Sequence, residues 1–204
     1  MAGREGRNHD EIRLRVLDAA EAIAAAQGHA GLSARGIASA AGYTVGTLYL
    51  VFKNRDDLIL QVNGRTLDRL HDHLLANHPE DPRGGPEEAI TALARTYIAY
   101  AETESPRWNM LFERVAEDGD PLPEWFRHKR ERVFALVEAA LRPLARDESE
   151  ARRAARVLWA GVQGICTLKI RQRMDLTDGQ NADEMAAMLI RNFLLGFTAE
   201  QRRH

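Results

Sequence analysis

Anion recognition is the chemistry for which the stretch AGYTVGTLYLVFKNRDDL, residues 41–58, is best equipped. It combines hydroxyl-bearing side chains and aromatic rings with cations near its end. From Ala22 to Arg55 the sequence contains no carboxylate, and Arg35, Lys53 and Arg55 are positively charged, although the whole chain has a net charge of −2. Because the distribution of charge matters more than its sum, this window is a candidate partner for phosphate groups.

Four residues in and before this stretch mark the ends of predicted helices. Ser33 is a good N-cap for a short helix, which Gly42 ends by adopting a left-handed turn. Thr44 caps a second short helix, predicted over residues 45–52, and Asn54 caps a longer helix behind it. Two short helices joined by a turn that contains glycine form the helix-turn-helix arrangement, whose second helix fits the major groove of DNA.

A plain corner between two core helices is the alternative interpretation, because helix-turn-helix corners also occur without DNA. Both interpretations need an inward apolar stripe, and the polar side chains on the outer face with the neighbouring cations favour the groove reader. The predicted inward stripe consists of Ile37, Ala38, Ala41, Leu48 and Phe52.

The run GLSARGIASAAGYTVGTLYLVFKNRDDL, residues 31–58, resembles the tetracycline-repressor (TetR) family of bacterial transcription regulators. That family shows Leu-Ser/Thr-x-x-x-Ile-Ala, then Ala-Gly, then Gly-x-Leu-Tyr-x-x-Phe, followed by a basic residue, an acidic residue and Leu. The resemblance implies a sequence-specific DNA-binding regulator, most often a repressor. The matching residues are Leu32, Ser33, Ile37, Ala38, Ala41, Gly42, Gly46, Leu48, Tyr49, Phe52, Arg55, Asp56 and Leu58.

The resemblance also implies roles for individual side chains. Arg35 and Thr47 would reach base edges or nearby phosphates, whereas Tyr49 and Ser33 would contact the sugar-phosphate backbone. Arg55 stands where the family most often has lysine and would hold a phosphate, with the option of binding it through two nitrogens. The predicted DNA contacts are Ser33, Arg35, Tyr43, Thr44, Val45, Thr47, Tyr49, Lys53 and Arg55.

Three of the residues in this stretch are less polar than a typical DNA contact. Tyr43 occupies a turn position that the family often fills with valine, so we expect its ring to be half-buried with its hydroxyl free. Val45 and Val51 occupy positions that can face the groove, where thymine methyl groups lie.

Helical periodicity dominates the whole chain and predicts an all-α protein. We expect an N-terminal three-helix helix-turn-helix DNA-binding domain over residues 1–55, joined by a long helix to a C-terminal helical ligand-binding and dimerisation domain over residues 56–204, with about nine helices in all. Further helices are predicted near residues 8–27, 54–78, 87–102, 106–116, 122–144, 148–173 and 182–197.

Aromatic and soft apolar residues concentrate in the middle of the C-terminal part, where a pocket for a small, mainly apolar effector is expected. An aromatic residue at helical spacing also fits a plain core. The resemblance implies release of the repressor from its operator when the effector binds. The predicted ligand-binding residues are Tyr97, Tyr100, Trp108, Phe112, Trp125, Phe126 and Gln163.

The resemblance implies that the last two helices form a dimer interface. A homodimer on a palindromic double-stranded DNA operator is expected, since helix-turn-helix proteins read two half-sites. Residues 155–168 resemble the Trp-x-x-x-His-Gly segment of one subgroup of these C-terminal domains, with Trp159 and Gly164 matching and Gln163 in place of the histidine. The same apolar residues would also serve to close a monomer. The predicted interface residues are Trp159, Ile165, Met188, Phe193 and Leu195.

An enzyme and a helical interaction protein without DNA binding are the competing functions. The sequence has no GxSxG, GxxxxGK[ST] or HExxH motif, so we predict no catalytic residues, no metal site and no cofactor. Cys166 is expected to be a small buried hydrophobe. No apolar run of 18 residues or signal peptide is evident, which predicts a cytoplasmic protein that does not contact a membrane.

Overall fold

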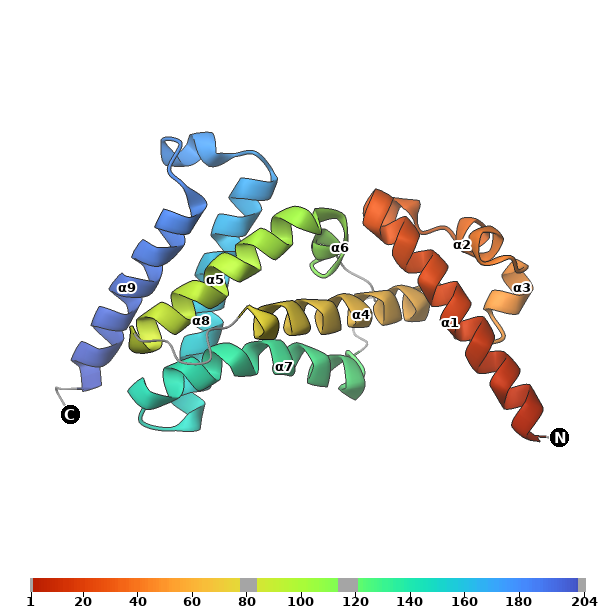
Figure 1. The fold of residues 1–204 in the computed structure, drawn as a ribbon, viewed down its shortest axis with the longest axis horizontal. Coiled ribbons are helices and arrows are strands. Elements are labelled where there is room, and N and C mark those ends of the chain that lie inside the picture. The colour runs from red at the N-terminus through yellow and green to blue at the C-terminus, as the bar shows by residue number, and fades with distance from the viewer. Residues whose placement is uncertain (1, 78–83, 114–120, 202–204) are drawn as a thin grey trace. The chain divides into compact units, whose positions relative to one another are not determined.

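The computed structural model describes residues 2–77, 84–113 and 121–201, and all regular elements in these ranges are helical, as predicted (Figure 1). The short 3₁₀ helices are η1 (Gly28–Gly31), η2 (Arg142–Leu144) and η3 (Met174–Thr177). The α-helices are α1 (Ala2–Gln27), α2 (Ala34–Ala41), α3 (Val45–Leu48), α4 (Arg55–Ala76), α5 (Gly85–Thr103), α6 (Ser105–Met110), α7 (Glu124–Leu141), α8 (Glu148–Ile170) and α9 (Ala182–Gln201).

Where the structure describes them, the predicted helix ends agree with these bounds to within four residues, except that α1 begins six residues before the predicted residue 8. The predicted ends of α4 at residue 78 and of α6 at residue 116 lie outside the described residues. Such small differences are expected, because helix ends fray and carry the weakest sequence signal.

Contacts divide the chain into two compact units that interleave along the sequence. Unit 1 consists of residues 1–68 and 104–127, and unit 2 consists of residues 69–103 and 128–204. The domain boundary predicted after residue 55 coincides with the start of α4, whereas the contacts change from one unit to the other within that helix, after Asp68.

Unit 1 is built on one apolar cluster that α1, α2, α3 and the first half of α4 share. Leu48 and Phe52 belong to it, and α6 adds Met110. The cluster includes the predicted inward stripe, of which Ala41 is partly buried, so the two short helices are held to α1 by packing. Its buried members are Ile12, Val16, Leu17, Ala20, Ala24, Leu32, Ile37, Ala38, Leu48, Val51, Phe52, Leu58, Ile59, Val62 and Met110.

All three predicted N-caps of this unit are formed. Ser33 Oγ accepts a hydrogen bond from the backbone of Gly36 (3.1 Å), and Thr44 Oγ1 accepts one from Thr47 (3.2 Å). Asn54 Oδ1 accepts a hydrogen bond from the third residue of α4 (2.8 Å). These bonds satisfy backbone groups that helix starts leave open, so the turn geometry is specified locally.

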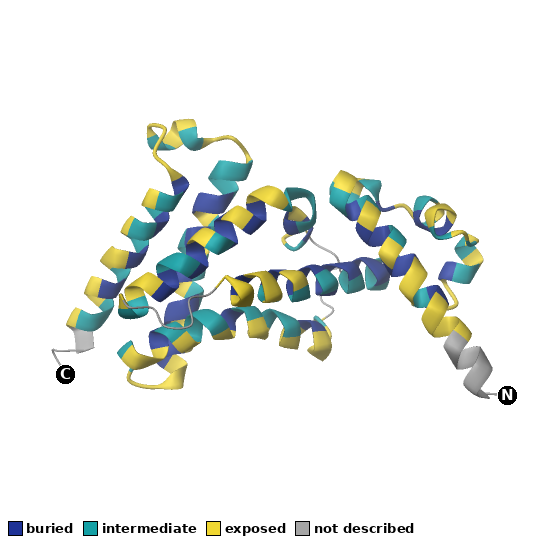
Figure 2. Cartoon of the chain, viewed as in Figure 1, coloured by how far each residue is buried: buried dark blue, intermediate teal, exposed yellow. Residues whose placement is uncertain are grey.

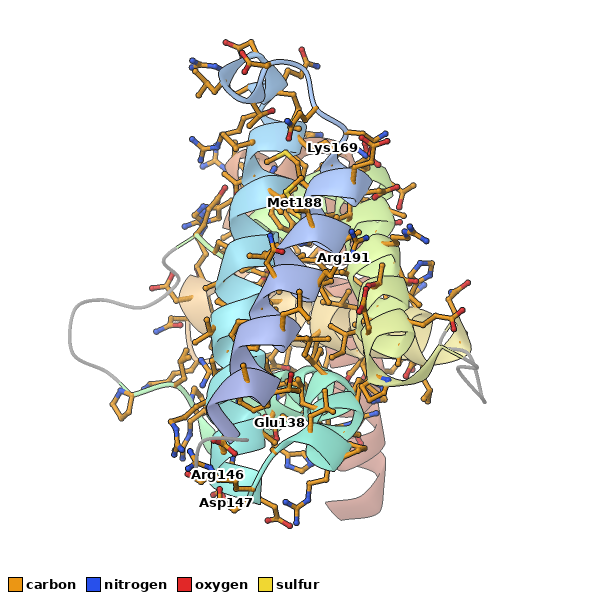
Figure 3. All side chains as sticks on the ribbon, turned by 90° about the vertical axis from the view of Figure 1, so that its left-hand side faces the viewer. Glu138, Arg146, Asp147, Lys169, Met188 and Arg191 are labelled. Atoms are coloured by element: carbon orange, nitrogen blue, oxygen red, sulfur yellow. The ribbon has the colours of Figure 1, made fainter. Side chains whose placement is uncertain are left out.

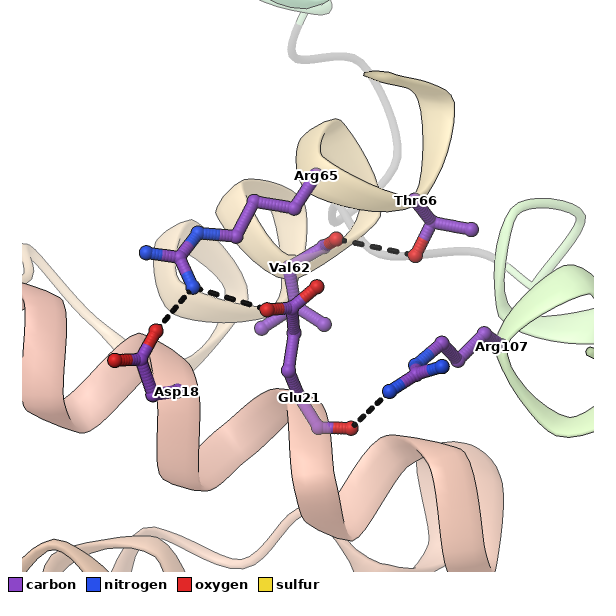
Figure 4. Close-up of polar contacts among 6 residues, drawn as sticks. All are labelled: Asp18, Glu21, Val62, Arg65, Thr66 and Arg107. Atoms are coloured by element: carbon purple, nitrogen blue, oxygen red, sulfur yellow. Dashed lines mark hydrogen bonds and ion pairs between the residues drawn. The ribbon is translucent and has the colours of Figure 1, made fainter. Parts of the chain in front are cut away.

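Polar contacts tie α4 and α6 to α1 within unit 1 (Figure 4). Arg65 Nη1 donates to Asp18 Oδ1 (2.6 Å) and to Glu21 Oε2 (3.0 Å), and Arg107 Nη2 donates to the backbone oxygen of Glu21 (3.4 Å). Burial lowers the pKa of Arg65, but the bonds to the two carboxylates outweigh this effect and leave the pKa above its ordinary value. The buried carboxylate of Glu21 is thus paired, as a buried charge must be.

Unit 2 is a helical body in which α5, α8 and α9 pack on one another (Figures 1 and 2). The start of α8 is fixed by Asp147 Oδ1, which accepts from the backbone of Glu150 (2.8 Å), while Glu150 Oε2 accepts from the backbone of Arg146 (2.6 Å). Gly161 permits the close approach of α8 and α9, because a Cβ atom there would lie 2.5 Å from Leu189 Cδ2. The missing side chain at Gly161 thus leaves room for Leu189 of α9.

Candidate nucleic-acid interface and apolar cavity

The outer face of the helix-turn-helix presents a set of polar side chains to solvent. Of the nine predicted contacts, Ser33, Arg35, Thr44, Tyr49 and Lys53 are exposed. The other four, which are Tyr43, Val45, Thr47 and Arg55, are partly buried. Unit 1 therefore carries the nine residues on α2, on α3, at the first residue of α4 and in the segments next to these helices, and five of them expose hydroxyl, phenol, guanidinium or ammonium groups.

Thr44 and Thr47 share one hydrogen-bonding arrangement at the start of α3. Their hydroxyl oxygens lie 2.9 Å apart, and Thr44 Oγ1 also accepts from the backbone of Thr47. One hydroxyl hydrogen of the pair is used between the two side chains, so the other stays available to an acceptor on DNA. The cap therefore orients a donor on the surface that the sequence assigned to the groove.

The α-helical part of α3 is shorter than predicted, because it ends at Leu48 and not at Phe52. One predicted groove position, Val51, is also wrong. Beyond Leu48 the chain tightens, with Leu50 donating to Thr47 (3.2 Å) and Val51 donating to Leu48 (3.2 Å), both over three residues. The prediction that Val51 can face the groove is wrong, because its side chain is only 6% exposed and belongs to the core. Leu50 is 67% exposed instead, because helical spacing places it on the side opposite Leu48, whereas Val51, three residues after Leu48, falls on the inward side.

Arg55 is engaged within unit 1. Its Nε donates to the backbone oxygen of Leu32 (2.8 Å), and its Nη2 lies 3.3 Å from His29 Nε2. His29 Nδ1 in turn lies 2.9 Å from Glu113 Oε2. If Arg55 also binds phosphate, it does so with a guanidinium that already connects the start of α4 to the turn before α2.

Two arginines on α1 lie beside the helix-turn-helix, and the sequence interpretation did not include them. The guanidinium carbon of Arg13 lies 5.0 Å from the ring centroid of Phe52, and that of Arg15 lies 5.9 Å from the ring centroid of Tyr43. A hydrogen bond to Tyr43 raises the pKa of Arg15 above its ordinary value. The charge window that began after Glu21 left both residues out.

Unit 2 contains an apolar cavity with a volume of about 50 Å³. Two of its lining residues, Tyr97 and Trp159, have a polar side-chain group. The Tyr97 hydroxyl donates to Gln163 Oε1 (2.6 Å). The guanidinium carbon of Arg156 lies 3.5 Å from the ring centroid of Phe134, another lining residue. The lining residues are Leu74, Ile90, Leu93, Ala94, Tyr97, Val133, Phe134, Val137, Leu158, Trp159, Val162 and Ile190.

The predicted ligand-binding residues fall into two groups. Tyr97 lines the cavity, Gln163 bonds to it, and Tyr100 is buried in the same unit against His73, with ring centroids 5.5 Å apart. The others, which are Trp108, Phe112, Trp125 and Phe126, belong to unit 1 and are not among the residues that line this cavity. The aliphatic lining was missed because a valine or leucine at helical spacing looks like any core residue.

The predicted dimer residues are also divided between the interior and the surface. Ile165 is buried within the chain, Trp159 lines the cavity, and Phe193 stacks on Phe197 with ring centroids 5.7 Å apart. The other two, Met188 and Leu195, are exposed on α9, and Figure 3 shows Met188 on the outward side of that helix. On α8 the apolar Val157, which was not predicted, is exposed as well, and so is Gly164, where an added Cβ atom would have no neighbour within 4 Å.

Other kinds of site find little support in the described part of the chain. No group of three or more His, Cys, Asp or Glu side chains there is arranged to hold a metal ion. Cys166 is buried, and burial raises the pKa of its thiol to about 12, as expected of a small buried hydrophobe. None of the described helices is long and apolar enough to cross a membrane.

Comparison with known proteins decides the family. Residues 16–62 match the family described as "Bacterial regulatory proteins, tetR family", and residues 90–193, half of the chain, match "Tetracyclin repressor-like, C-terminal domain". The chain belongs to the TetR family. It is therefore a DNA-binding transcriptional regulator, in agreement with the resemblance seen in the sequence. Membership of the Trp-x-x-x-His-Gly subgroup stays a prediction.

Individual relatives of this TetR-family chain agree over most of its length. It is 28% identical over 177 residues to the HTH-type transcriptional regulator TtgR of Pseudomonas putida, and the match covers 81% of this chain and 83% of the relative. A solved protein of unknown function from Rhodococcus sp. RHA1 has the same fold, with a TM-score of 0.72, 21% identity and coverage of 91% and 94%. The multidrug binding protein EbrR, solved with imidazole, has a TM-score of 0.62, 26% identity and coverage of 92% of each chain.

Proposed function

We propose that this regulator is a cytoplasmic, homodimeric repressor that leaves a palindromic operator when a small, mainly apolar effector binds unit 2. The observation that carries the proposal is the apolar cavity of unit 2 in a chain whose unit 1 presents an exposed helix-turn-helix face. The protein then acts by binding alone, with no catalysis and no cofactor.

The size of the cavity supports an effector that binds by shifting a conformational equilibrium. Pockets for drug-sized ligands typically measure roughly 300–1,000 Å³, so a cavity of about 50 Å³ is too small to hold such a ligand. An effector must therefore select a conformation in which the lining helices stand further apart. Since α4 contributes residues to both units, a shift of α4 would carry that change to the DNA-binding unit.

The chemistry of the lining supports an uncharged effector. Among the lining residues only Tyr97, which is bonded to Gln163, and Trp159 carry polar side-chain groups, and none is charged. A charged ligand would therefore lose its hydration without gaining a counter-charge in that wall. EbrR, one of the similar proteins, is called a multidrug binding protein, which is consistent with an apolar pocket in a protein of this fold. Titration calorimetry with a library of small apolar compounds, paired with release of bound DNA, tests this part; a library without a single releasing compound would refute it.

Selection of bound fragments from its own genome tests the DNA-binding part. We expect wild-type protein to enrich a palindromic motif whose half-sites are about one helical turn, roughly 34–36 Å, apart. Tyr49→Ala removes an exposed phenol beside α3 and should weaken binding to all enriched fragments, because backbone contacts carry little sequence information. Leu75→Ala, an exposed apolar change in unit 2, is the control.

Two results would contradict this assignment. Equal enrichment by Tyr49→Ala and by the control would show that the face around α3 does not contact DNA. No enrichment by wild-type protein at any salt concentration would refute operator binding itself.

A further inference from the structure

Arg15 of α1 lies against the turn of the helix-turn-helix. Its Nη1 donates a hydrogen bond to the hydroxyl of Tyr43 (3.4 Å), and its guanidinium carbon lies 5.9 Å from the centroid of that ring. Tyr43 directly precedes Thr44, the N-cap of α3. A cation from the first helix is therefore placed beside the residues that orient the groove-reading helix.

Arg13, two residues earlier on the same helix, provides a contrast. Its guanidinium lies over Phe52 and its Nη1 donates to Gln61 Oε1 (3.1 Å), and the side chain is partly buried. Arg15 is exposed, and no described carboxylate lies within ion-pair distance of it, although Glu11 lies on the preceding turn. Of the two cations, Arg15 is the one whose charge is left to solvent.

We propose that Arg15 and the Tyr43 hydroxyl together bind one phosphate of the DNA backbone, a contact that α1 adds to those of α2, α3 and the start of α4. The guanidinium has further N–H donors that can engage two phosphate oxygens side by side. The Tyr43 hydroxyl accepts from Arg15, so its own hydrogen can be donated to the same phosphate. The inference rests on the DNA-binding function and adds Arg15 to it, as the partner of Tyr43, which is already among the predicted contacts.

This contact would position α3 and would not select a sequence. Phosphate contacts fix the register and angle of a protein on the duplex without reading bases. Because the partly buried ring of Tyr43 packs against the core of unit 1, the pair would hold the phosphate at a fixed place relative to α3. Its loss should therefore weaken binding to every duplex by a similar factor.

The salt dependence of DNA binding tests the proposal. Fluorescence anisotropy with a labelled duplex of random sequence, about 30 base pairs or roughly three helical turns long, gives the slope of log K against log salt for wild type, Arg15→Gln and Arg13→Gln. We expect Arg15→Gln to reduce the size of that slope by about 0.9 per protomer, and Arg13→Gln to leave it unchanged. Far-ultraviolet circular dichroism checks that each variant is folded.

A double-mutant cycle assigns the role of the hydroxyl. Tyr43→Phe should weaken duplex binding in the wild-type background and have no further effect once Arg15→Gln is present, since the two groups serve one phosphate. Should Arg15→Gln fail to fold, Arg15→Lys keeps the charge and should retain the slope with lower affinity.

The outcomes separate this proposal from the function on which it rests. An unchanged slope for Arg15→Gln, or an equal loss for Arg13→Gln, overturns the phosphate contact while DNA binding stands. If Tyr43→Phe costs the same affinity in both backgrounds, the hydroxyl is not part of the contact. If wild-type protein binds neither this duplex nor any genomic fragment, the DNA-binding function fails and the proposal with it.

Discussion

Lys53 and Arg55 lie two residues apart around the start of α4, yet their side chains are used differently. Lys53 is exposed, and its backbone N–H donates to Asp57 Oδ2 (2.9 Å). Arg55 is partly buried and donates to the backbone oxygen of Leu32. Sequence alone assigned both to phosphate because both are cations near a helix start. It could not reveal the partner of Arg55, since that carbonyl lies 23 residues earlier in the chain.

Substitution of these two cations should separate stability from DNA affinity. Arg55→Ala leaves the Leu32 carbonyl without this charged donor, so we expect the free energy of unfolding to fall by about 1–3 kcal/mol. Lys53→Ala keeps the backbone bond to Asp57 and should change stability by less than about 0.5 kcal/mol while weakening DNA binding. Urea denaturation measures the first effect and anisotropy the second. Equal urea midpoints for Arg55→Ala and wild type would show that Arg55 does not stabilise the fold.

At the level of helices, local signals were predictable and long-range packing was not. Ser33, Thr44 and Asn54 were identified as caps because a capping bond joins residues three apart in the sequence. The early end of α3 at Leu48 was not predicted, because Leu48, Val51 and Phe52 also have the spacing of one inward face of a longer helix. The pocket was predicted from aromatic residues, four of which fold into unit 1 because α6 and the start of α7 belong there.

The proposal that the effector binds in the cavity can be tested by enlarging a side chain that lines it. Val162→Ile adds one carbon to the wall that α8 contributes, and filling the gap should raise the free energy of unfolding by roughly 0.5–1 kcal/mol, the reverse of an Ile-to-Val loss. The substitution should also weaken the binding of any effector found by calorimetry, while the affinity of the protein for its operator stays unchanged. Ala135→Val, which adds volume at an exposed position of α7 in the same unit, is the control. Effector affinity that is the same for both variants would place the binding site elsewhere.

At the scale of the molecule, the exposed faces of α8 and α9 are the feature that a single chain leaves unexplained. Gly164 and Gly196 stand within helices, and a Cβ atom added at either position would have no neighbour within 4 Å, although glycine costs about 1 kcal/mol relative to alanine in a helix. Met188 and Leu195 expose apolar surface on α9. Small residues and apolar side chains on adjoining helices are what a closely packed symmetric interface requires, which supports the proposed homodimer.

A charge placed on this face should separate the protomers. In a two-fold interface each substituted residue comes near its own copy or near apolar groups, so Leu195→Glu would bury an unpaired carboxylate and shift the protein toward monomers. Leu176→Glu makes the same change at an equally exposed leucine in η3, outside the face, and should leave the dimer intact. Sedimentation velocity over a range of protein concentrations distinguishes the two. Because a dimer ties two DNA-binding units together, Leu195→Glu should also lower operator affinity far more than Leu176→Glu. A Leu195→Glu variant that stays dimeric and keeps wild-type affinity would show that the protomers associate through another surface.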